Sequence, residues 1–203
     1  MTALDRVLAH PDVRRLARNL AARPGARLAV AEPQRRAAVA LILRLAADGE
    51  LELLMIKRAV YEGDPWSGHV ALPGGRREPG DPSLEATAIR ETREETAIDL
   101  ATRGRVLGTL DELHPRTPVL PPIVITPFVA VAASDVEVAP SPEVALAFGI
   151  PISALREPRA SREIELQLAG GPRRVPSFGY GEHTIWGLTE RILRQFLDRL
   201  SDP

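Results

Sequence analysis

The chain has 203 residues, of which 44% are hydrophobic and 26% charged, a balance that is ordinary for one globular domain with appendages. Its formal net charge of -1 argues against a nucleic-acid partner, because neutralising phosphates needs a clear excess of Lys and Arg. It has no cysteine, which excludes disulfides, thiolate metal sites and cysteine nucleophiles, and we expect a cytoplasmic location. No apolar run approaches about 18 residues, so no membrane-spanning helix is predicted.

Apolar residues recur at helical spacing near the N-terminus, at Leu4, Val7, Leu8, Val13, Leu16, Ala17 and Leu20. Pro11 marks a break between two short helices. The stretch is rich in arginine, as transit peptides are, but it lacks serine and an apolar core. We therefore expect residues 1–34 to form a helical extension that lies against a main domain of residues 35–203.

Strands and helices then alternate irregularly, which favours the α/β class. Two apolar runs, 37–45 and 51–59, are separated by Asp48-Gly49 and predict a hairpin of two mostly buried strands. Further strands are predicted at 105–111, 123–131 and 163–168, and a helix at 188–200. The proline-rich segment 112–122 is expected to be a loop.

A charged helix is predicted from about Ser83 to Thr96, after the tight turn at Gly74-Gly75. Glu91, Glu94 and Glu95 are spaced i, i+3 and i+4, so their mutually repelling carboxylates share one face. A divalent cation would offset this repulsion, and carboxylate oxygens suit Mg²⁺ or Mn²⁺. On the run "RETREE" alone, a solvated helix face is the ordinary alternative.

The run "GRREPGDPSLEATAIRETREETAI", residues 75–98, resembles the signature of the Nudix family. The signature has a glycine, an acid six residues on, and then Arg-Glu, an aliphatic residue, any residue, Glu-Glu, any residue, Gly and an aliphatic residue. Here these are Gly75, Asp81, Arg90-Glu91, Glu94-Glu95 and Ile98. One extra residue precedes Arg90, Thr92 takes the aliphatic place, and Ala97 replaces the glycine.

The signature together with the sequence on either side of it resembles the branch of the family that contains coenzyme A pyrophosphatases. Its features here are Arg58, Gly68 and "LPGG" before the signature, the extra residue within it, and the segments 141–155 and 183–193 after it. Asp64 departs from the branch, which has a second arginine at that place.

The resemblance implies an α/β/α sandwich with a mixed β-sheet, and metal-dependent hydrolysis of the diphosphate in coenzyme A or a related nucleoside diphosphate derivative. Glu91, Glu94 and Glu95 would hold Mg²⁺ or Mn²⁺, and a homodimer is expected. An ADP-ribose or nucleotide-sugar pyrophosphatase is the nearest alternative. A non-catalytic nucleotide-binding regulator and hydrolysis of oxidised nucleoside triphosphates are others.

The remaining candidate residues would act around the metal carboxylates. Arg90, one turn from Glu94, is expected to orient a ligand carboxylate. Glu143, which matches the family's Glu-Val segment, is a candidate general base or further metal ligand, with a surface-loop glutamate as the alternative. Candidates for substrate binding are Arg58, Arg76 and Arg77, whose guanidinium groups match phosphate geometry, and Trp66, which could stack a base or pack.

Overall fold

The computed structural model describes residues 1–29, 35–62, 66–115, 122–168 and 171–201. A mixed seven-stranded sheet runs through the main body in the order β3-β2-β1-β6-β5, with β4 paired to β1 and β7 paired to β2. Its strands are β1 (Arg35–Leu45), β2 (Leu51–Arg58), β3 (Val70–Ala71), β4 (Gly74–Arg76), β5 (Gly104–Thr109), β6 (Ile123–Ala132) and β7 (Val144–Pro151). The helices are α1 (Ala3–Ala9), α2 (Pro11–Ala22), α3 (Leu84–Thr96), α4 (Leu100–Arg103), α5 (Ile152–Arg156) and α6 (Gly187–Ser201), with a 3₁₀ turn, η1, at Pro158–Ala160.

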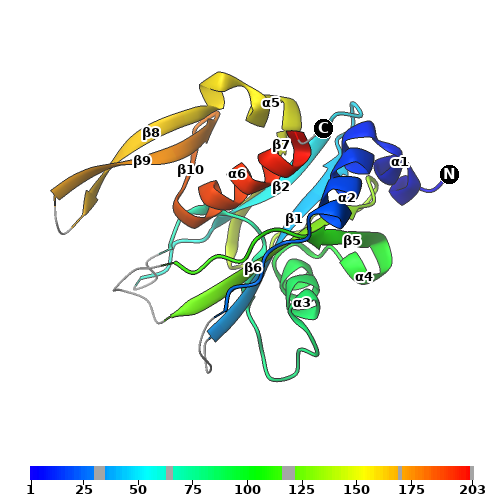
Figure 1. Ribbon diagram of the computed structural model, residues 1–203, viewed down its shortest axis with the longest axis horizontal. Helices are drawn as coiled ribbons and strands as arrows, with labels where there is room; N and C mark the ends of the chain where they lie inside the picture. The colour runs from blue at the N-terminus through cyan, green and yellow to red at the C-terminus, as the bar shows by residue number, and fades with distance from the viewer. Residues whose placement is uncertain (30–34, 63–65, 116–121, 169–170, 202–203) are drawn as a thin grey trace.

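The sheet separates two hydrophobic cores, and the alternation of side chains along β1 feeds both. Leu41 and Leu43 belong to the core beneath α1, α2 and α6, whereas Ala40 and Ile42 belong to the core beneath α3 and α4. Helices thus cover both faces of the sheet (Figure 1), which confirms the predicted α/β class and the layered sandwich.

The predicted hairpin is confirmed. Strands β1 and β2 pair antiparallel, with Arg44 opposite Glu52 and Leu45 opposite Leu51. Strand β1 also pairs in parallel with β6, which explains why both strands read as continuous apolar runs: they lie inside the sheet with both faces covered.

The N-terminal helices lie against the main body, as expected. Val7, Val13, Leu16 and Leu20 have exposed fractions of 2% or less and belong to the same core as α6. Thr2 caps α1 through a capping box with Asp5. The division at residue 34 stays a prediction, because the extension contributes to the core of the domain that follows it.

A second, three-stranded sheet consists of β8 (Ser161–Leu168), β9 (Gly171–Tyr180) and β10 (His183–Trp186). Figure 1 shows β8 and β9 as a ribbon that projects from the body, while β10 leads into α6. The sequence predicted β8 and α6 but not β7, β9 or β10. Pro and Gly interrupt the apolar residues of β7 and β9, only Ser177 and Phe178 of β9 are buried, and β10 has only four residues, so the usual burial pattern is weak.

Helix α3 begins and ends where the sequence predicted. Ser83 is its N-cap and accepts a hydrogen bond from the Ala86 N–H, and Ala97 follows its last turn in a left-handed conformation with φ 62°. Segment 112–122 was expected to be a loop, and within it Leu113 forms an isolated β-bridge with Ile125. Residues 116–121 of that loop and Asp64 lie outside the described residues.

Candidate active site

The candidate site is the contact between α3 and the short strand β4. Strand β4 pairs antiparallel with β1, so that Ala38 faces Gly75 and Val39 faces Gly74. A side chain at Gly75 would place its Cβ 2.4 Å from Oε1 of Glu91. The glycine therefore leaves the space that the Glu91 carboxylate occupies against the backbone of β4.

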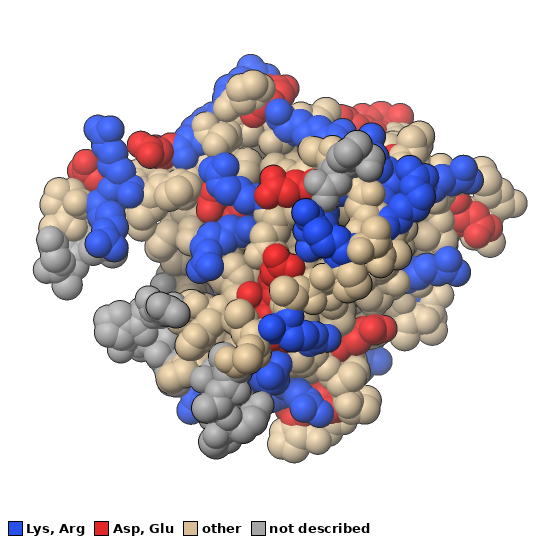
Figure 2. Space-filling model, in the orientation of Figure 1, with Lys and Arg blue, Asp and Glu red and all other residues tan. Residues whose placement is uncertain are grey.

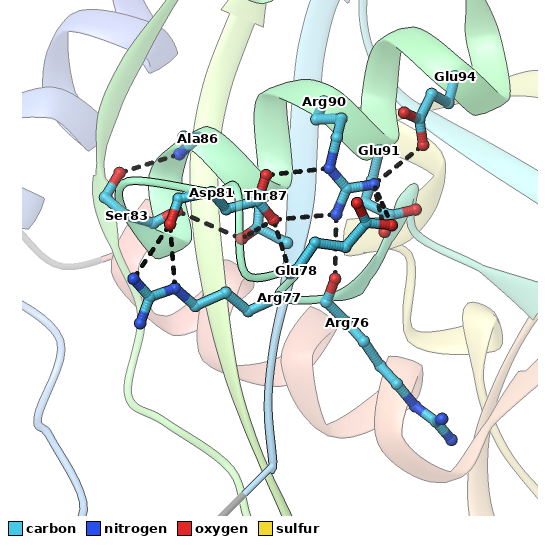
Figure 3. Close-up of polar contacts among 10 residues, drawn as sticks. All are labelled: Arg76, Arg77, Glu78, Asp81, Ser83, Ala86, Thr87, Arg90, Glu91 and Glu94. Atoms are coloured by element: carbon cyan, nitrogen blue, oxygen red, sulfur yellow. Dashed lines mark hydrogen bonds and ion pairs between the residues drawn. The ribbon is translucent and has the colours of Figure 1, made fainter.

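Arg90 is the centre of a polar network on this face of α3 (Figure 3). Its Nε and Nη2 each donate to a carboxylate oxygen of Asp81 at 3.0 Å, a two-point pairing that fixes the guanidinium plane. Its Nη1 donates to Glu91 at 2.9 Å and to Glu94 at 3.0 Å, and Nη2 also donates to the Arg76 carbonyl. One arginine thus fixes two of the three candidate metal carboxylates.

Asp81 is buried and held from several directions. Besides Arg90, its carboxylate accepts hydrogen bonds from the Glu78 N–H at 2.9 Å and the Thr87 hydroxyl at 2.9 Å. The hydrogen bonds from Arg90 and from the Glu78 backbone hold the pKa of Asp81 well below its usual range. Asp81 is therefore the charged anchor on which Arg90 is oriented.

The three candidate metal carboxylates have different surroundings. The side chain of Glu94 is 53% exposed, while Glu95 is buried and accepts a hydrogen bond from the Gly74 N–H at 2.8 Å. Burial raises the pKa of Glu95 to about 7, and burial also raises the pKa of Glu91. The charge of Glu91 adds to the rise at Glu95, and the charge of Glu94 adds to the rise at Glu91.

These residues fit a divalent cation by the chemistry of their donors. Burial disfavours the negative charge of Glu95 and of Glu91, and a nearby cation would stabilise that charge. Among the described residues, no three His, Cys, Asp or Glu side chains surround one point, since Arg90 lies between Glu91 and Glu94 and Glu95 is turned to Gly74. The assignment of metal ligands stays a prediction.

The structure brings two more candidates to Glu95. Arg58, at the end of β2, lowers the pKa of Glu95 through its charge, while Glu143 raises it. Arg58 pairs with Val144 in β7, the residue after Glu143, and the Ser141 N–H donates to the backbone carbonyl of Glu95. Glu143 is therefore close enough to act at the same site.

The other three candidates lie further from the carboxylates. The side chain of Arg76 extends away from the network in Figure 3 and only its carbonyl takes part. Arg77 donates from Nε and Nη2 to the Asp81 carbonyl, at 3.3 and 3.0 Å. Trp66 is 40% exposed in the loop before β3, outside the network around Arg90.

Sequence reasoning gave no role to two groups that the structure shows to matter. Thr87 orients the Asp81 carboxylate, and the backbone N–H of Gly74 holds Glu95. The signal for Thr87 was its position six residues after Asp81 and one turn before Arg90. No signal could reveal the Gly74 contact, because it joins residues 21 apart through a backbone group.

Comparison with known proteins agrees with this geometry. The model of the NUDIX domain matches residues 34–165. The chain belongs to the Nudix hydrolase family. It is accordingly a pyrophosphohydrolase, and hydrolases of this family generally depend on a divalent metal.

The names of the relatives give the family but no substrate. It is 33% identical to the uncharacterized Nudix hydrolase NudL of Yersinia pestis over 168 residues, 82% of this chain and 80% of the relative. It is also 33% identical to NudL of Photorhabdus laumondii over 135 residues, 66% of this chain and 70% of the relative. A MutT/nudix protein from Enterococcus faecalis shares the fold, with a TM-score of 0.59 at 19% identity, over 85% of this chain and 64% of that one.

Two surface features bear on partners. On the face that Figure 2 shows, basic and acidic side chains of the described residues are interspersed rather than separated into fields of one sign. Among the described helices, none is long and apolar enough to cross a membrane.

Proposed function

We propose that this Nudix hydrolase uses Mg²⁺ to hydrolyse the diphosphate bond of coenzyme A or a related nucleoside diphosphate derivative. The observation that carries the proposal is that Arg90 holds Glu91 and Glu94 beside the Gly74-Gly75 turn, while Glu95 of the same helix accepts a hydrogen bond from the Gly74 N–H. The features shared with the coenzyme A pyrophosphatase branch, Arg58 and "LPGG" among them, support the choice of substrate class. A homodimer and a cytoplasmic location rest on the sequence considerations alone and stay predictions.

The cation would be held by Glu91, Glu94 and Glu95, with Mn²⁺ as the alternative metal. When bound, it supplies neutralisation of phosphoryl charge and a lowered pKa of water, which together make attack on phosphorus possible near neutral pH.

Residues of the chain perform the positioning. Arg90, anchored on Asp81, fixes the carboxylates of Glu91 and Glu94, so its role is that of a positioning residue. Glu143, which acts electrostatically on Glu95, is the proposed base that takes a proton from the attacking water.

The substrate's phosphates are assigned to Arg58, Arg76 and Arg77, whose guanidinium groups form two-point hydrogen bonds with phosphate oxygens. Arg58 lies beside Glu95 at one end of the site, and Arg77 lies beside Asp81 at the other. Trp66, exposed in the loop before β3, is proposed to stack a base of the substrate.

The test is product analysis with purified protein and Mg²⁺, given coenzyme A, ADP-ribose, NADH or a deoxynucleoside triphosphate in separate reactions. We expect coenzyme A to yield phosphopantetheine and 3′,5′-ADP. We also expect Glu94→Gln to lower the rate about 100-fold or more, because a metal ligand is lost. Glu182→Gln, an exposed carboxylate in the turn between β9 and β10, is the matched control and should retain the wild-type rate.

The outcomes separate the parts of the proposal. Cleavage of another diphosphate in place of coenzyme A would overturn the substrate assignment but not the proposal that the carboxylates of α3 hold the metal. Cleavage that is equally fast in Glu94→Gln would remove the metal assignment. No cleavage of any substrate with Mg²⁺ or Mn²⁺ would overturn the catalytic proposal in favour of a nucleotide-binding regulator.

A further inference from the structure

A hollow of about 390 Å³ lies at the beginning of α3, beside the network around Arg90 rather than within it. Three arginines line it, each from a different segment: Arg27 from the stretch before β1, Arg36 from β1 and Arg77 from the residue that follows β4. The first turn of α3 and Phe128 of β6 complete its walls.

Two of these arginines meet the same carboxylate among the described residues. Arg27 and Arg36 share one carboxylate, that of Glu112, at 2.9 and 3.3 Å. Glu112 is buried and also accepts hydrogen bonds from the Leu28 N–H and the Thr126 hydroxyl, so it is fully engaged. Arg27 and Arg36 thus converge on one carboxylate at the edge of the hollow.

Arg77 adds a third positive charge to the hollow. It donates to a neutral backbone carbonyl, that of Asp81, and its side chain meets no carboxylate among the residues that the structure describes. Glu85, an exposed residue of the first turn of α3, is the acidic residue among the described residues of the wall and opposes the charge of the arginines. Among the described residues at the hollow, three guanidinium groups are thus accompanied by the carboxylates of Glu112 and Glu85, a balance that favours an anion.

The sheet register places Arg77 close along the chain to the strand residue against which Glu91 packs. Arg77 donates its N–H to the Arg36 carbonyl, which extends the β1–β4 pairing in which Gly75 faces Ala38. Arg77 is thus two residues beyond Gly75, against which Glu91 packs, and two residues of strand span about 7 Å. Because side chains two apart on a strand face the same side, Arg77 faces the side of Gly75 on which Glu91 packs, and Arg36 faces the side of Ala38, which belongs to the core beneath α3.

We propose that this hollow binds a phosphate monoester that the substrate carries apart from its diphosphate. A ribose that bears the diphosphate at C5′ and a second phosphate at C2′ or C3′ spans a length comparable to the offset of about 7 Å between Gly75 and Arg77 along the strand. Guanidinium groups are the side chains that best match the geometry and charge of a phosphate monoester. The inference rests on the proposed function, since it assigns a second contact to the substrate of the same active site.

The first experiment measures binding without turnover, by calorimetry with 3′,5′-ADP and with 5′-AMP, which differ by one phosphate monoester. We expect wild type to bind 3′,5′-ADP at least tenfold tighter, and Arg77→Gln and Arg36→Gln each to reduce that ratio severalfold. Glu85→Gln should increase the ratio, because it removes the opposing charge. Arg14→Gln, which removes an exposed charge on α2 away from the hollow, should leave it unchanged.

Two outcomes of this experiment overturn the inference. One is equal affinity of wild type for the two nucleotides, or no measurable binding of 3′,5′-ADP at millimolar concentration. The other is a preference that persists in both Arg77→Gln and Arg36→Gln. Arg77 is exposed, so its variant is expected to fold even if loss of the Glu112 ion pair in Arg36→Gln harms the protein.

The second experiment compares hydrolysis of coenzyme A with that of dephospho-coenzyme A in the presence of Mg²⁺. We expect the KM of wild type to be about tenfold lower for coenzyme A than for dephospho-coenzyme A. Arg77→Gln should reduce this difference, mainly by raising the KM for coenzyme A. If neither compound is cleaved, the proposed function fails while the binding ratio still decides the inference. If both are cleaved and Arg77→Gln slows them equally, the inference fails while the proposed function stands.

Discussion

At the scale of single residues, Gly75 shows how a missing side chain can serve a functional group. The Glu91 carboxylate fills the place of a Cβ at residue 75, with three of its atoms within 2.4 to 2.6 Å of that position. The end of a glutamate can move aside at little cost to the fold, but it cannot move aside and keep its geometry toward Arg90. The glycine is therefore required by the site more than by the sheet.

Gly75→Ala is expected to lower the rate of hydrolysis by about 10- to 100-fold, because a displacement of about 1 Å in a positioned group has effects of this size. The free energy of unfolding should change by less than about 1 kcal/mol. Kinetics and urea denaturation measure the two effects. Gly80→Ala is the control, since a Cβ there meets nothing within 4 Å; full activity in Gly75→Ala would contradict this account of the turn.

Ala97 is a second residue whose backbone conformation matters. It ends α3 in the left-handed region, with φ 62°, where a Cβ is disfavoured. Ala97→Gly is expected to stabilise the protein by about 1 kcal/mol, because glycine adopts this conformation without steric cost. Ala86→Gly, within α3, should instead destabilise it by about 0.5–1 kcal/mol. Equal effects of the two changes in urea denaturation would show that conformation at residue 97 carries no strain.

At the scale of elements, the N-terminal helices are structural members of the domain. Helix α2 packs on α6 and β5, and Asn19 and Arg15 donate hydrogen bonds to carbonyls at the end of α6. These contacts satisfy two of the carbonyls that the last turn of a helix leaves open. Helix α2 therefore closes one face of the sheet and the end of α6 together.

Leu16→Ala tests this role. Leu16 is fully buried on α2, and truncating a buried leucine costs about 2–5 kcal/mol. Arg14→Ala on the exposed face of the same helix should cost about 0.5 kcal/mol or less. The midpoint of urea unfolding distinguishes the two, and a cost below about 1 kcal/mol for Leu16→Ala would mean that α2 detaches without harm to the core.

At the scale of the whole molecule, Glu112 joins segments distant in the chain. It links Arg27, before the sheet, to Arg36 of β1 and to Thr126 of β6. Burial opposes its charged form, but hydrogen bonds from the Leu28 N–H, Arg27 and Thr126 outweigh this effect and lower its pKa below the ordinary 4.5.

Because the folded-state pKa of Glu112 is lowered, its contribution to stability is present above about pH 4.5 and is lost as the pH falls through the folded-state value. Unfolding free energies of wild type should therefore decline below pH 4.5 more steeply than those of Glu112→Gln. Glu163→Gln, an exposed residue of β8, should follow wild type. Parallel curves for wild type and Glu112→Gln between pH 3 and 6 would refute this linkage.

The pattern of apolar residues was sufficient for the elements that lie in the middle of the sheet or present a clear helical stripe. The predicted boundaries are close to those observed for strands β1, β2 and β6 and for helices α3 and α6. A strand that is covered on both faces is apolar throughout, and a helix that is covered on one face has apolar residues at helical spacing, so both give strong signals. Strands β4 and β10 are too short for such a signal, and in β9 only Ser177 and Phe178 are buried.

By itself, the sequence determined the α/β class, the helix that carries Glu91, Glu94 and Glu95, and the family, since each depends on local spacing along the chain. Only the tertiary structure decided that Arg90 is held by Asp81 and in turn holds Glu91 and Glu94. It alone brought Arg27, Arg36 and Arg77 into one hollow. The physical reason is that ion pairs and hollows depend on which strands pair and in what register. The spacing of charged residues along the sequence does not reveal which residues they pair with in the fold.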